Sequence, residues 1–151
     1  MSNTQTPSGR MRISDENLHI SSFGLVRTEP GSLLFVRATD AHPLSFRRGR
    51  LLLPATMLKF GERPMDAADR AVKTQLSGVT GTAPKFVDIQ SYMGSHWDIC
   101  FVYEFDVRGK GRPAALPPYA DAASYKLDSL PRAQIAEDHL EIIDGLSVSH
   151  T

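Results

Sequence analysis

The feature that most constrains this chain is an alternating apolar run between positions 96 and 107. Every second side chain from position 99 onward is apolar: Ile99, Phe101, Tyr103, Phe105 and Val107. A period of two places these side chains on one face of a β-strand. Because Cys100 and Val102 add apolar side chains to the opposite face, we predict a strand that is covered on both sides. Such a strand excludes an all-helical fold.

A helix is predicted from Pro64, because proline lacks an N–H that would be unpaired at the first helical position in any case. Spacings of three and four give this helix one apolar stripe: Met65, Ala68, Val72 and Leu76. Two acid-before-base pairs at i, i+4 are predicted on its wetter face: Asp66 with Arg70, and Asp69 with Lys73. Gly78 is the predicted stop, since glycine commonly follows the last helical turn.

Other runs in the N-terminal half are typical of strands. Runs at 20–26 and 33–37 flank Pro30-Gly31, and proline fixes φ while glycine accepts positive φ. We therefore predict a turn there and a hairpin formed by the two runs. A third run at 51–53 ends at Pro54, which cannot donate to a strand ladder.

The C-terminal half is predicted to contain a strand at 86–92, a loop or lid at 113–124 and a short strand at 125–127. Pro131 opens a second predicted helix, and Gly145 is its predicted stop. The buried stripe of this helix is predicted to be Ala136, Leu140 and Ile143. Strands and helices in this order indicate an α+β fold.

Composition sets further bounds. The 151 residues fit one domain, predicted at 13–151 behind a disordered tail at 1–12. With 17 basic and 17 acidic residues, the chain is not expected to bind a nucleic acid polymer. Its one cysteine, Cys100, excludes a disulfide framework and is expected to be a buried, inert thiol. Neither a signal peptide nor a membrane helix is apparent, so a cytoplasmic protein without membrane association is expected.

A family resemblance is carried by positions 53–70, which read Leu-Pro-Ala-Thr-Met-Leu-Lys-Phe-Gly-Glu-Arg-Pro-Met-Asp-Ala-Ala-Asp-Arg. This stretch resembles the Leu-Pro-Gly-Gly…Gly-Glu…Ala-Ala…Arg run of the Nudix hydrolases. In that family a loop–helix–loop binds divalent metal against the diphosphate of a nucleoside diphosphate linked to another group. The resemblance spans 20–145 and implies an α/β/α sandwich with a mixed β-sheet. It gives Gly61, Glu62 and Arg70 the places of structural motif residues.

The metal-binding part of the motif is degenerate. The family pattern is Gly-x5-Glu-x7-Arg-Glu-U-x-Glu-Glu-x-Gly-U, with U aliphatic, and Glu62, Arg70 and Val72 match it. The departures are Thr56 for the first glycine, Ala71, Thr74 and Gln75 for three glutamates, and a closing glycine one residue late at Gly78. Positions 71, 74 and 75 share one helix face. Carboxylates there would supply the anionic oxygens that Mg²⁺ or Mn²⁺ requires, so metal-dependent hydrolysis by the usual route is not expected.

Several residues are candidates for the site. Glu62 is the residual catalytic and metal candidate, and the carboxylates weighed as substitutes are Asp66, Asp69 and Glu104. The predicted substrate-binding residues are Arg47, Arg48, Arg50 and Trp97, because guanidinium forks match phosphate and an indole stacks on a base. A solvated loop and a packed tryptophan are the alternatives. His96 and Asp98 point the same way at the start of the long strand, either as a functional pair or as polar decoration.

The combined expectation is a Nudix-fold protein that binds a nucleotide-type small molecule and is weakly active or inactive as a hydrolase. The basic run beside a motif without its acidic lining predicts a positive pocket that attracts phosphate. The alternatives are an active pyrophosphohydrolase with a rearranged Mg²⁺ or Mn²⁺ site, and a purely structural domain. No cofactor is expected otherwise. A homodimer is expected, because a neutral chain has little charge repulsion between copies.

Overall fold

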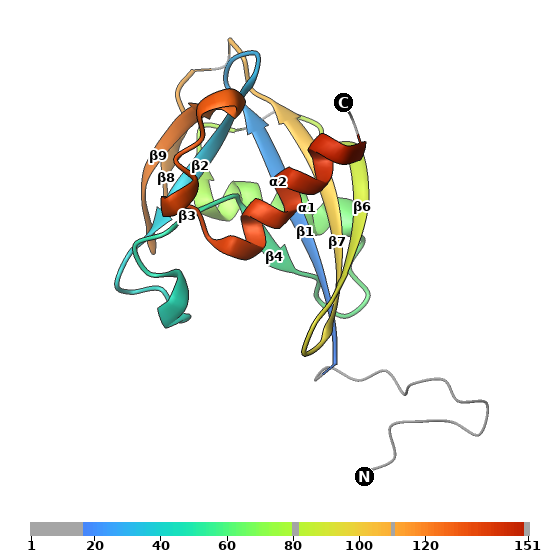
Figure 1. Ribbon diagram of the computed structural model, residues 1–151. Helices are drawn as coiled ribbons and strands as arrows, with labels where there is room; N and C mark the ends of the chain where they lie inside the picture. The colour runs from blue at the N-terminus through green and yellow to red at the C-terminus, as the bar shows by residue number, and fades with distance from the viewer. Residues whose placement is uncertain (1–16, 80–81, 110, 150–151) are drawn as a thin grey trace, which may run out of the picture.

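The structure is a computed structural model that describes residues 17–79, 82–109 and 111–149. Its elements are, in chain order, β1 (Leu18–Arg27), β2 (Ser32–Ala38), the 3₁₀-helix η1 (Ser45–Arg47), β3 (Leu51–Leu52), β4 (Ala55–Met57), α1 (Pro64–Gln75), β5 (Leu76–Ser77), β6 (Lys85–Met93), β7 (Trp97–Asp106), β8 (Ala114–Ala115), β9 (Tyr119–Lys126), the 3₁₀-helices η2 (Leu127–Ser129) and η3 (Arg132–Gln134), and α2 (Glu137–Ser149). Figure 1 shows their arrangement. The tail predicted at 1–12 lies outside the described residues.

The central sheet is mixed. Its strand order is β4-β1-β7-β6, with β1 parallel to β7 and the other two pairings antiparallel. The predicted long strand is confirmed as β7, which lies between two partners. A second sheet has the order β3-β2-β9, and β5 pairs with β8.

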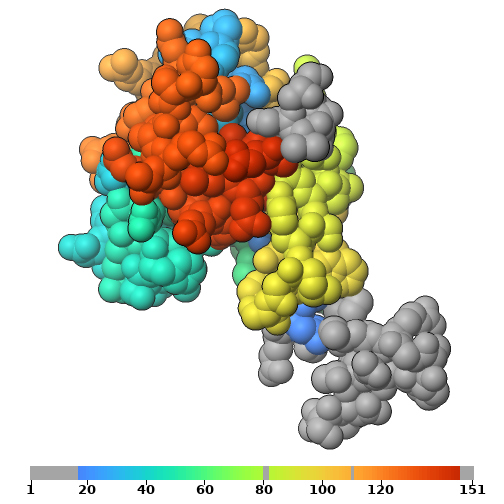
Figure 2. Space-filling view, viewed as in Figure 1, coloured from blue at the N-terminus to red at the C-terminus, as the bar shows by residue number. Residues whose placement is uncertain are grey.

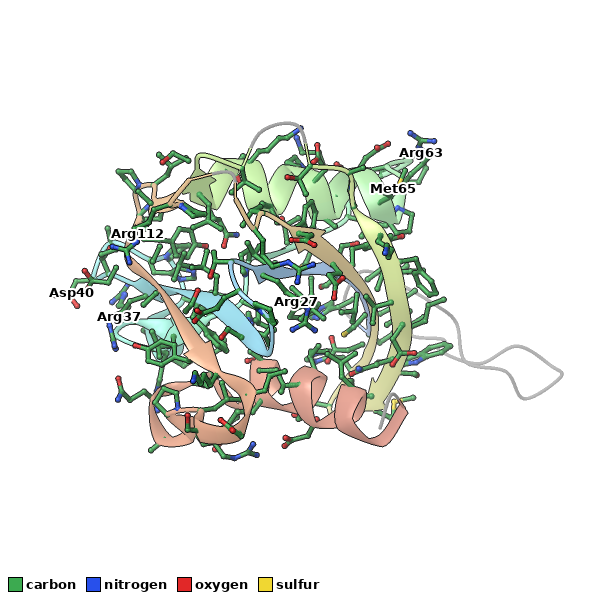
Figure 3. The ribbon with its side chains drawn as sticks, turned by 90° about the horizontal axis from the view of Figure 1, so that it is seen from above. Arg27, Arg37, Asp40, Arg63, Met65 and Arg112 are labelled. Carbon is green, nitrogen blue, oxygen red and sulfur yellow. The ribbon has the colours of Figure 1, made fainter. Side chains whose placement is uncertain are left out.

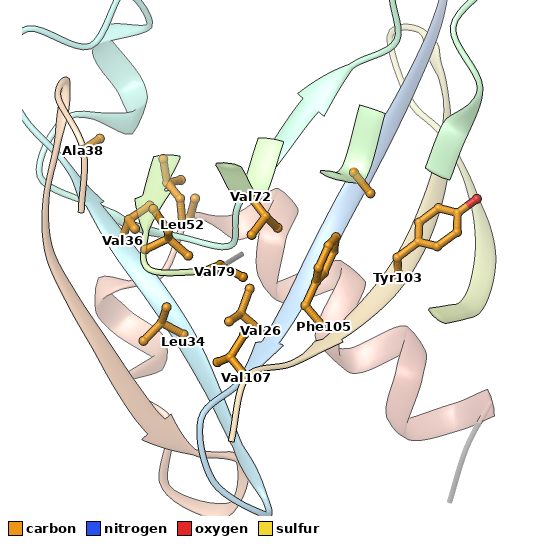
Figure 4. Close-up of a cluster of buried hydrophobic side chains, with 13 residues drawn as sticks. Val26, Leu34, Val36, Ala38, Leu52, Val72, Val79, Tyr103, Phe105 and Val107 are labelled. Atoms are coloured by element: carbon orange, nitrogen blue, oxygen red, sulfur yellow. The ribbon is translucent and has the colours of Figure 1, made fainter. Parts of the chain in front are cut away.

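The two helices cover opposite sides of the sheets, as Figure 3 shows from above. On the α1 side, Ala68 and Val72 belong to one buried cluster with Tyr103 and Phe105 of β7. Figure 4 labels Val72, Tyr103 and Phe105 in this cluster. On the α2 side, Ile142 and Ile143 belong to a second cluster that contains Cys100 and Val102. Alternate residues of β7 therefore enter different cores, which confirms the α/β/α sandwich. Within the described residues, no helix has the length and apolar character needed to cross a membrane.

The predicted N-terminal hairpin is wrong. The connection turns as expected, with φ of +73° at Gly31, but β1 and β2 belong to different sheets. Strand β7 pairs with β1 along one whole edge, and β4 pairs with the other edge at Ser21–Phe23. Strand β2 instead pairs with β3 and β9.

The segment 113–124 is not a loop or lid. It contains β8 and most of β9, and β9 pairs with β2 from Tyr119 to Lys126. The predicted short strand at 125–127 is thus the end of a longer one, with Leu127 already in η2. This strand contains three alanines and no regular apolar alternation, so its pairing with β2 is what establishes it.

The second helix starts later and ends later than predicted. Pro131 precedes the short η3, and α2 begins at Glu137. Gly145 lies inside α2 rather than at its end. A Cβ atom at Gly145 would lie 2.8 Å from Oε1 of Gln90, so the glycine provides space for a side chain from β6.

Candidate functional site

The loop before α1 is closed by the motif residues Glu62 and Arg70. Two nitrogens of Arg70 donate to the two oxygens of Glu62 at 3.0 and 2.9 Å, and Arg70 also donates to the carbonyl of Met57. The Lys59 N–H donates to Glu62 Oε1 at 2.9 Å. The hydrogen bond from Arg70, followed by that from Lys59, lowers the pKa of Glu62 to about 2. Glu62, the residual metal candidate, therefore has both oxygens engaged in holding the loop.

Helix α1 begins at Pro64 as predicted but ends at Gln75, and Leu76 continues as β5. Gly78 follows with φ of +80°. Met65 is exposed at the start of the stripe, whereas Ala68 and Val72 are fully buried.

Positions 71, 74 and 75 do not fit a Mg²⁺ or Mn²⁺ ion. Ala71 is fully buried and offers no ligand, and the Thr74 hydroxyl donates to the carbonyl of Arg70. Gln75 Nε2 donates to the carbonyl of Ala55 at 2.9 Å. Its Oε1 is buried and has no hydrogen-bond partner among the described residues. This face offers only neutral oxygens, whereas hard divalent ions require anionic ones.

The carboxylates weighed as substitutes are each paired with a base. The predicted pair of Asp66 and Arg70 is wrong, because Asp66 accepts from Arg63 and Arg70 binds Glu62; Arg63 points outward near the start of α1 (Figure 3). The predicted pair of Asp69 and Lys73 is present at 2.9 Å.

Glu104 lies away from the motif. It pairs with Arg27 of β1 at 2.6 Å. It is in phase with Cys100 and Val102, whose cluster includes residues of α2, so it occupies the face of the sheet that α1 does not cover.

A cavity of about 1190 Å³ opens beneath α2. It lies between the η1 segment and the β6–β7 turn, where Figure 2 shows the surface hollowed. Its charged lining is Arg47, Arg50, Arg132, Asp98, Glu137, Asp138 and Glu141, and four histidines join it: His19, His42, His96 and His139. The lining is therefore mixed in charge, not positive as the sequence predicted.

Two of the three predicted phosphate-binding arginines line the cavity, and the third does not. Arg47 and Arg50 line the cavity, and Arg50 donates to the carbonyl of Ala133. Arg48 is absent from the lining and donates to the carbonyl of His42. Trp97 is also outside the lining, and its indole N–H donates to Ser91 Oγ at 2.8 Å.

Arg47 has the least exposed side chain of the three arginines that line the cavity. One nitrogen pairs with Asp138 and another lies 2.7 Å from His139 Nε2. Its Nε is buried and has no partner among the described residues. The guanidinium therefore has one buried nitrogen without a hydrogen-bond partner among the described residues.

Burial keeps His139 neutral at ordinary pH. The Leu53 N–H donates to its Nδ1 at 2.9 Å, and burial lowers its pKa to about 4. Burial, followed by the charge of Arg47, also lowers the pKa of His42. Cys100 is buried, as predicted, and burial raises the pKa of its thiol to about 12. His42 and His19 were missed by sequence reasoning, because neither lies in a motif.

His96 and Asp98 do face the same side, as the alternation predicted. His96 Nε2 lies 3.2 Å from an oxygen of Asp98, and both residues line the cavity. His19 of β1 joins them, with Nδ1 3.6 Å from the other Asp98 oxygen.

Comparison with known proteins identifies the fold. No protein-family model matches the sequence, and no curated protein matches it. The structure is similar to a MutT protein from Methanosarcina mazei Go1, with a TM-score of 0.70 and 13% identity over 92% of this chain and 99% of that one. It is also similar to the Nudix domain of Shewanella oneidensis NrtR in complex with ADP ribose, with a TM-score of 0.65 and 14% identity over 97% and 94% of the two chains.

A third neighbour is a bifunctional NMN adenylyltransferase/ADP ribose pyrophosphatase from Francisella tularensis, complexed with AMP and a manganese ion. The TM-score is 0.66 and the identity 19%, and the match covers 91% of this chain but 43% of that one. The overall fold described above is therefore shared with all three of these structures. The chain therefore has the fold of the Nudix hydrolases.

Proposed function

We propose that this chain binds a nucleotide-type small molecule in the cavity beneath α2 and does not hydrolyse it by the usual metal-dependent route. The proposal rests on one juxtaposition: a cavity containing Arg47 lies beside a motif helix with no carboxylate at positions 71, 74 and 75. Binding and hydrolysis are separable, because hydrolysis also needs a metal to polarise phosphate and activate water.

Two unsatisfied atoms support ligand binding. Arg47 Nε is a donor and Gln75 Oε1 an acceptor, and both residues line the cavity. A buried polar atom without a partner costs about 1–3 kcal/mol. Both atoms are themselves buried. After a side-chain rotation that turns them toward the cavity, a phosphate oxygen would satisfy Arg47 and a hydroxyl or amino group would satisfy Gln75. Tyr92 and Tyr119 provide aromatic surface for a base.

Structural neighbours support this ligand class. The Shewanella domain is complexed with ADP ribose, and the Francisella protein with AMP and manganese. We carry over only the chemistry that these ligands share, a nucleoside joined to phosphate.

Binding is tested by calorimetry in EDTA with ADP-ribose, nucleoside diphosphates and dinucleotides. We expect at least one to bind with a Kd on the order of micromolar. Arg50→Gln removes a cavity guanidinium and should weaken binding about tenfold. Arg63→Gln is the matched control, because Arg63 pairs with Asp66 outside the cavity. No binding of any of these ligands at millimolar concentration would overturn the proposal.

Hydrolysis is tested with the same compounds in Mg²⁺ or Mn²⁺. We expect no release of phosphate or monophosphate above background, because the motif lacks its carboxylate ligands. Metal-dependent turnover that disappears in Glu62→Gln would instead establish the alternative, an active pyrophosphohydrolase with a rearranged metal site.

Association remains part of the proposal. Strand β6 lies at the end of its sheet, and its large apolar side chains Phe86, Ile89 and Met93 are 53%, 53% and 71% exposed. An edge strand with apolar side chains favours pairing with another chain, so we propose a homodimer. Light scattering coupled to gel filtration should give twice 16.6 kDa, and the monomer mass throughout a dilution series would reject it.

A further inference from the structure

We propose that His19, His96 and Asp98 form a binding site for a divalent transition-metal ion of the Zn²⁺ type. The cluster lies at the β6–β7 end of the cavity, away from the motif helix and its missing carboxylates. It is independent of the proposed nucleotide binding, since it rests on other residues and is tested without a nucleotide.

The fold brings the three residues together through strand pairing. In the parallel ladder of β1 and β7, His19 is opposite Asp98, so adjacent strands present these side chains on one face. His96 precedes Asp98 by two residues, at the end of the β6–β7 turn. All three line the cavity. Their arrangement therefore depends on the backbone register and not on a chance meeting of long side chains.

The distances suit a single ion. One ligand atom from each residue lies within 4.8 Å of the others. His19 Nδ1 is 3.6 Å from Asp98 Oδ1, and His96 Nε2 is 3.2 Å from Asp98 Oδ2. Two ligands that each lie about 2.1 Å from tetrahedral zinc are roughly 3.4 Å apart. The observed spacings are close to this value but involve different oxygens of Asp98, so a small rotation of the carboxylate would bring one oxygen to both histidines.

The ring nitrogen of His96 that faces away from Asp98 has a hydrogen-bonding partner, as is usual for metal-binding histidines. Ser95 Oγ lies 3.1 Å from His96 Nδ1. A proton on Nδ1 shared with this hydroxyl leaves the Nε2 lone pair directed at Asp98 and the ion. The centroids of the His19 and His96 rings are 4.1 Å apart. Both imidazoles contact the carboxylate of Asp98.

The two histidines and one aspartate determine which type of metal ion the site would prefer. Imidazole nitrogens suit zinc and neighbouring transition metals, whereas Mg²⁺ prefers oxygen ligands. Three protein ligands also leave a fourth position of zinc for water or a ligand atom. The side chains are 31%, 33% and 39% exposed, so an ion reaches them from solvent through the cavity mouth.

Calorimetry on the full chain, stripped with EDTA and dialysed, tests the site with Zn²⁺ and separately with Mg²⁺ as titrants. We expect one Zn²⁺ per chain and no competition from Mg²⁺. His19→Gln, His96→Gln and Asp98→Asn should each weaken Zn²⁺ binding at least about tenfold. Asp106→Asn is the matched control, because Asp106 is on the same strand but pairs with Arg108, and it should bind Zn²⁺ as the unchanged chain does.

A measurement on the unchanged chain covers the case in which a variant fails to fold. Histidine ring signals in NMR spectra should shift for His19 and His96 on addition of Zn²⁺, while those of His42 and His139 stay in place. Absence of saturable Zn²⁺ binding, equal affinity in folded Asp98→Asn, or shifts confined to His42 and His139 would each overturn the proposal.

Discussion

The motif loop with α1 has a recognisable backbone arrangement but few metal-binding side chains. The cavity beneath α2 has many charged and histidine side chains but no sequence motif. Around α1, the motif geometry is intact: Pro64 starts the helix and Arg70 holds Glu62 with two hydrogen bonds. Positions 71, 74 and 75 of this region have no carboxylate. The cavity belongs to no recognisable motif, yet it contains three arginines, four histidines and four carboxylates. The loop geometry and a carboxylate lining are therefore separate features of this chain.

The same two regions differ in how far apart their partners lie in sequence. Arg70 and Glu62 are 8 residues apart, whereas Arg47 and His139 are 92 apart. A pattern search can detect the first kind of contact. The second kind exists only once η1 and α2 are packed on one side of the sheet.

Introducing carboxylates at positions 71, 74 and 75 tests whether the geometry of α1 can bind a divalent metal ion. The variant Ala71→Glu/Thr74→Glu/Gln75→Glu should bind Mn²⁺, which we do not expect of the unchanged chain. Without metal its free energy of unfolding should fall by about 3 kcal/mol or more, since Ala71 is fully buried and an added charge there is poorly solvated.

The control for that variant is Ala71→Gln/Thr74→Gln, which has the same size without charge. Calorimetry and urea unfolding with and without Mn²⁺ separate the two effects. If the charged variant folds but binds no Mn²⁺, the motif backbone does not retain the ion-binding geometry.

On the cavity side, stability should depend on pH through His139. Its pKa is about 4 in the folded chain against a usual 6.5, so the unfolded chain binds the extra proton between these values. The contribution of neutral His139 to the free energy of unfolding is complete above pH 6.5 and decreases as the pH falls toward 4. By about pH 4.5 the loss should reach roughly 2–3 kcal/mol, with His42 acting in the same direction.

Urea unfolding at neutral pH and at about pH 4.5 measures this loss. Glu62 and Asp106 contribute little to it, because the stabilisation from their lowered pKa values is lost mainly as the pH falls from their ordinary values of 4.5 and 3.8 toward about 2. The variant His139→Asn should flatten the dependence, and an equally steep dependence in that variant would assign it to other groups.

Two glycine substitutions compare packing on the two sides directly. A Cβ at Gly24 would lie 2.6 Å from Val72 Cγ2, and Val72 is buried and β-branched, so it has little freedom to move. Gly24→Ala should therefore cost about 2 kcal/mol. At Gly145 the obstacle is the flexible end of Gln90, and alanine gains about 1 kcal/mol in a helix.

We accordingly expect Gly145→Ala to cost less than Gly24→Ala when thermal unfolding of the two variants is compared. A larger loss at Gly145 would mean that Gln90 is held more rigidly than Val72. The contacts of Gln90 with the Ile142 carbonyl and with Tyr92 would then be the reason.

The smallest effect is expected at Gly61 in the motif loop. Its φ is +80° and a Cβ there would meet nothing within 4 Å, so only backbone strain opposes a side chain. Gly61→Ala should cost about 1 kcal/mol in urea unfolding. Gly61→Asn should cost less, because asparagine accepts positive φ more readily. Equal stability of Gly61→Ala and the unchanged chain would remove the structural role given to this residue.

The sequence by itself determined the parts that depend on neighbours along the chain. Alternation predicted β7, proline predicted the first residue of α1, and the motif indicated a closed loop at Glu62 and Arg70. Turn chemistry likewise placed positive φ at Gly31. Each of these follows from periodicity or from backbone geometry within a few residues, so local side chains carry the information.

Only the tertiary structure decided which edges pair and which side chains meet. It separated β1 from β2 by pairing β1 with β4 and β7. It also made a strand of the alanine-rich segment that became β9 by pairing it with β2. It also placed His19 opposite Asp98. Strand register and layer packing depend on partners tens of residues away, and no local pattern specifies which of several compatible partners a strand will take.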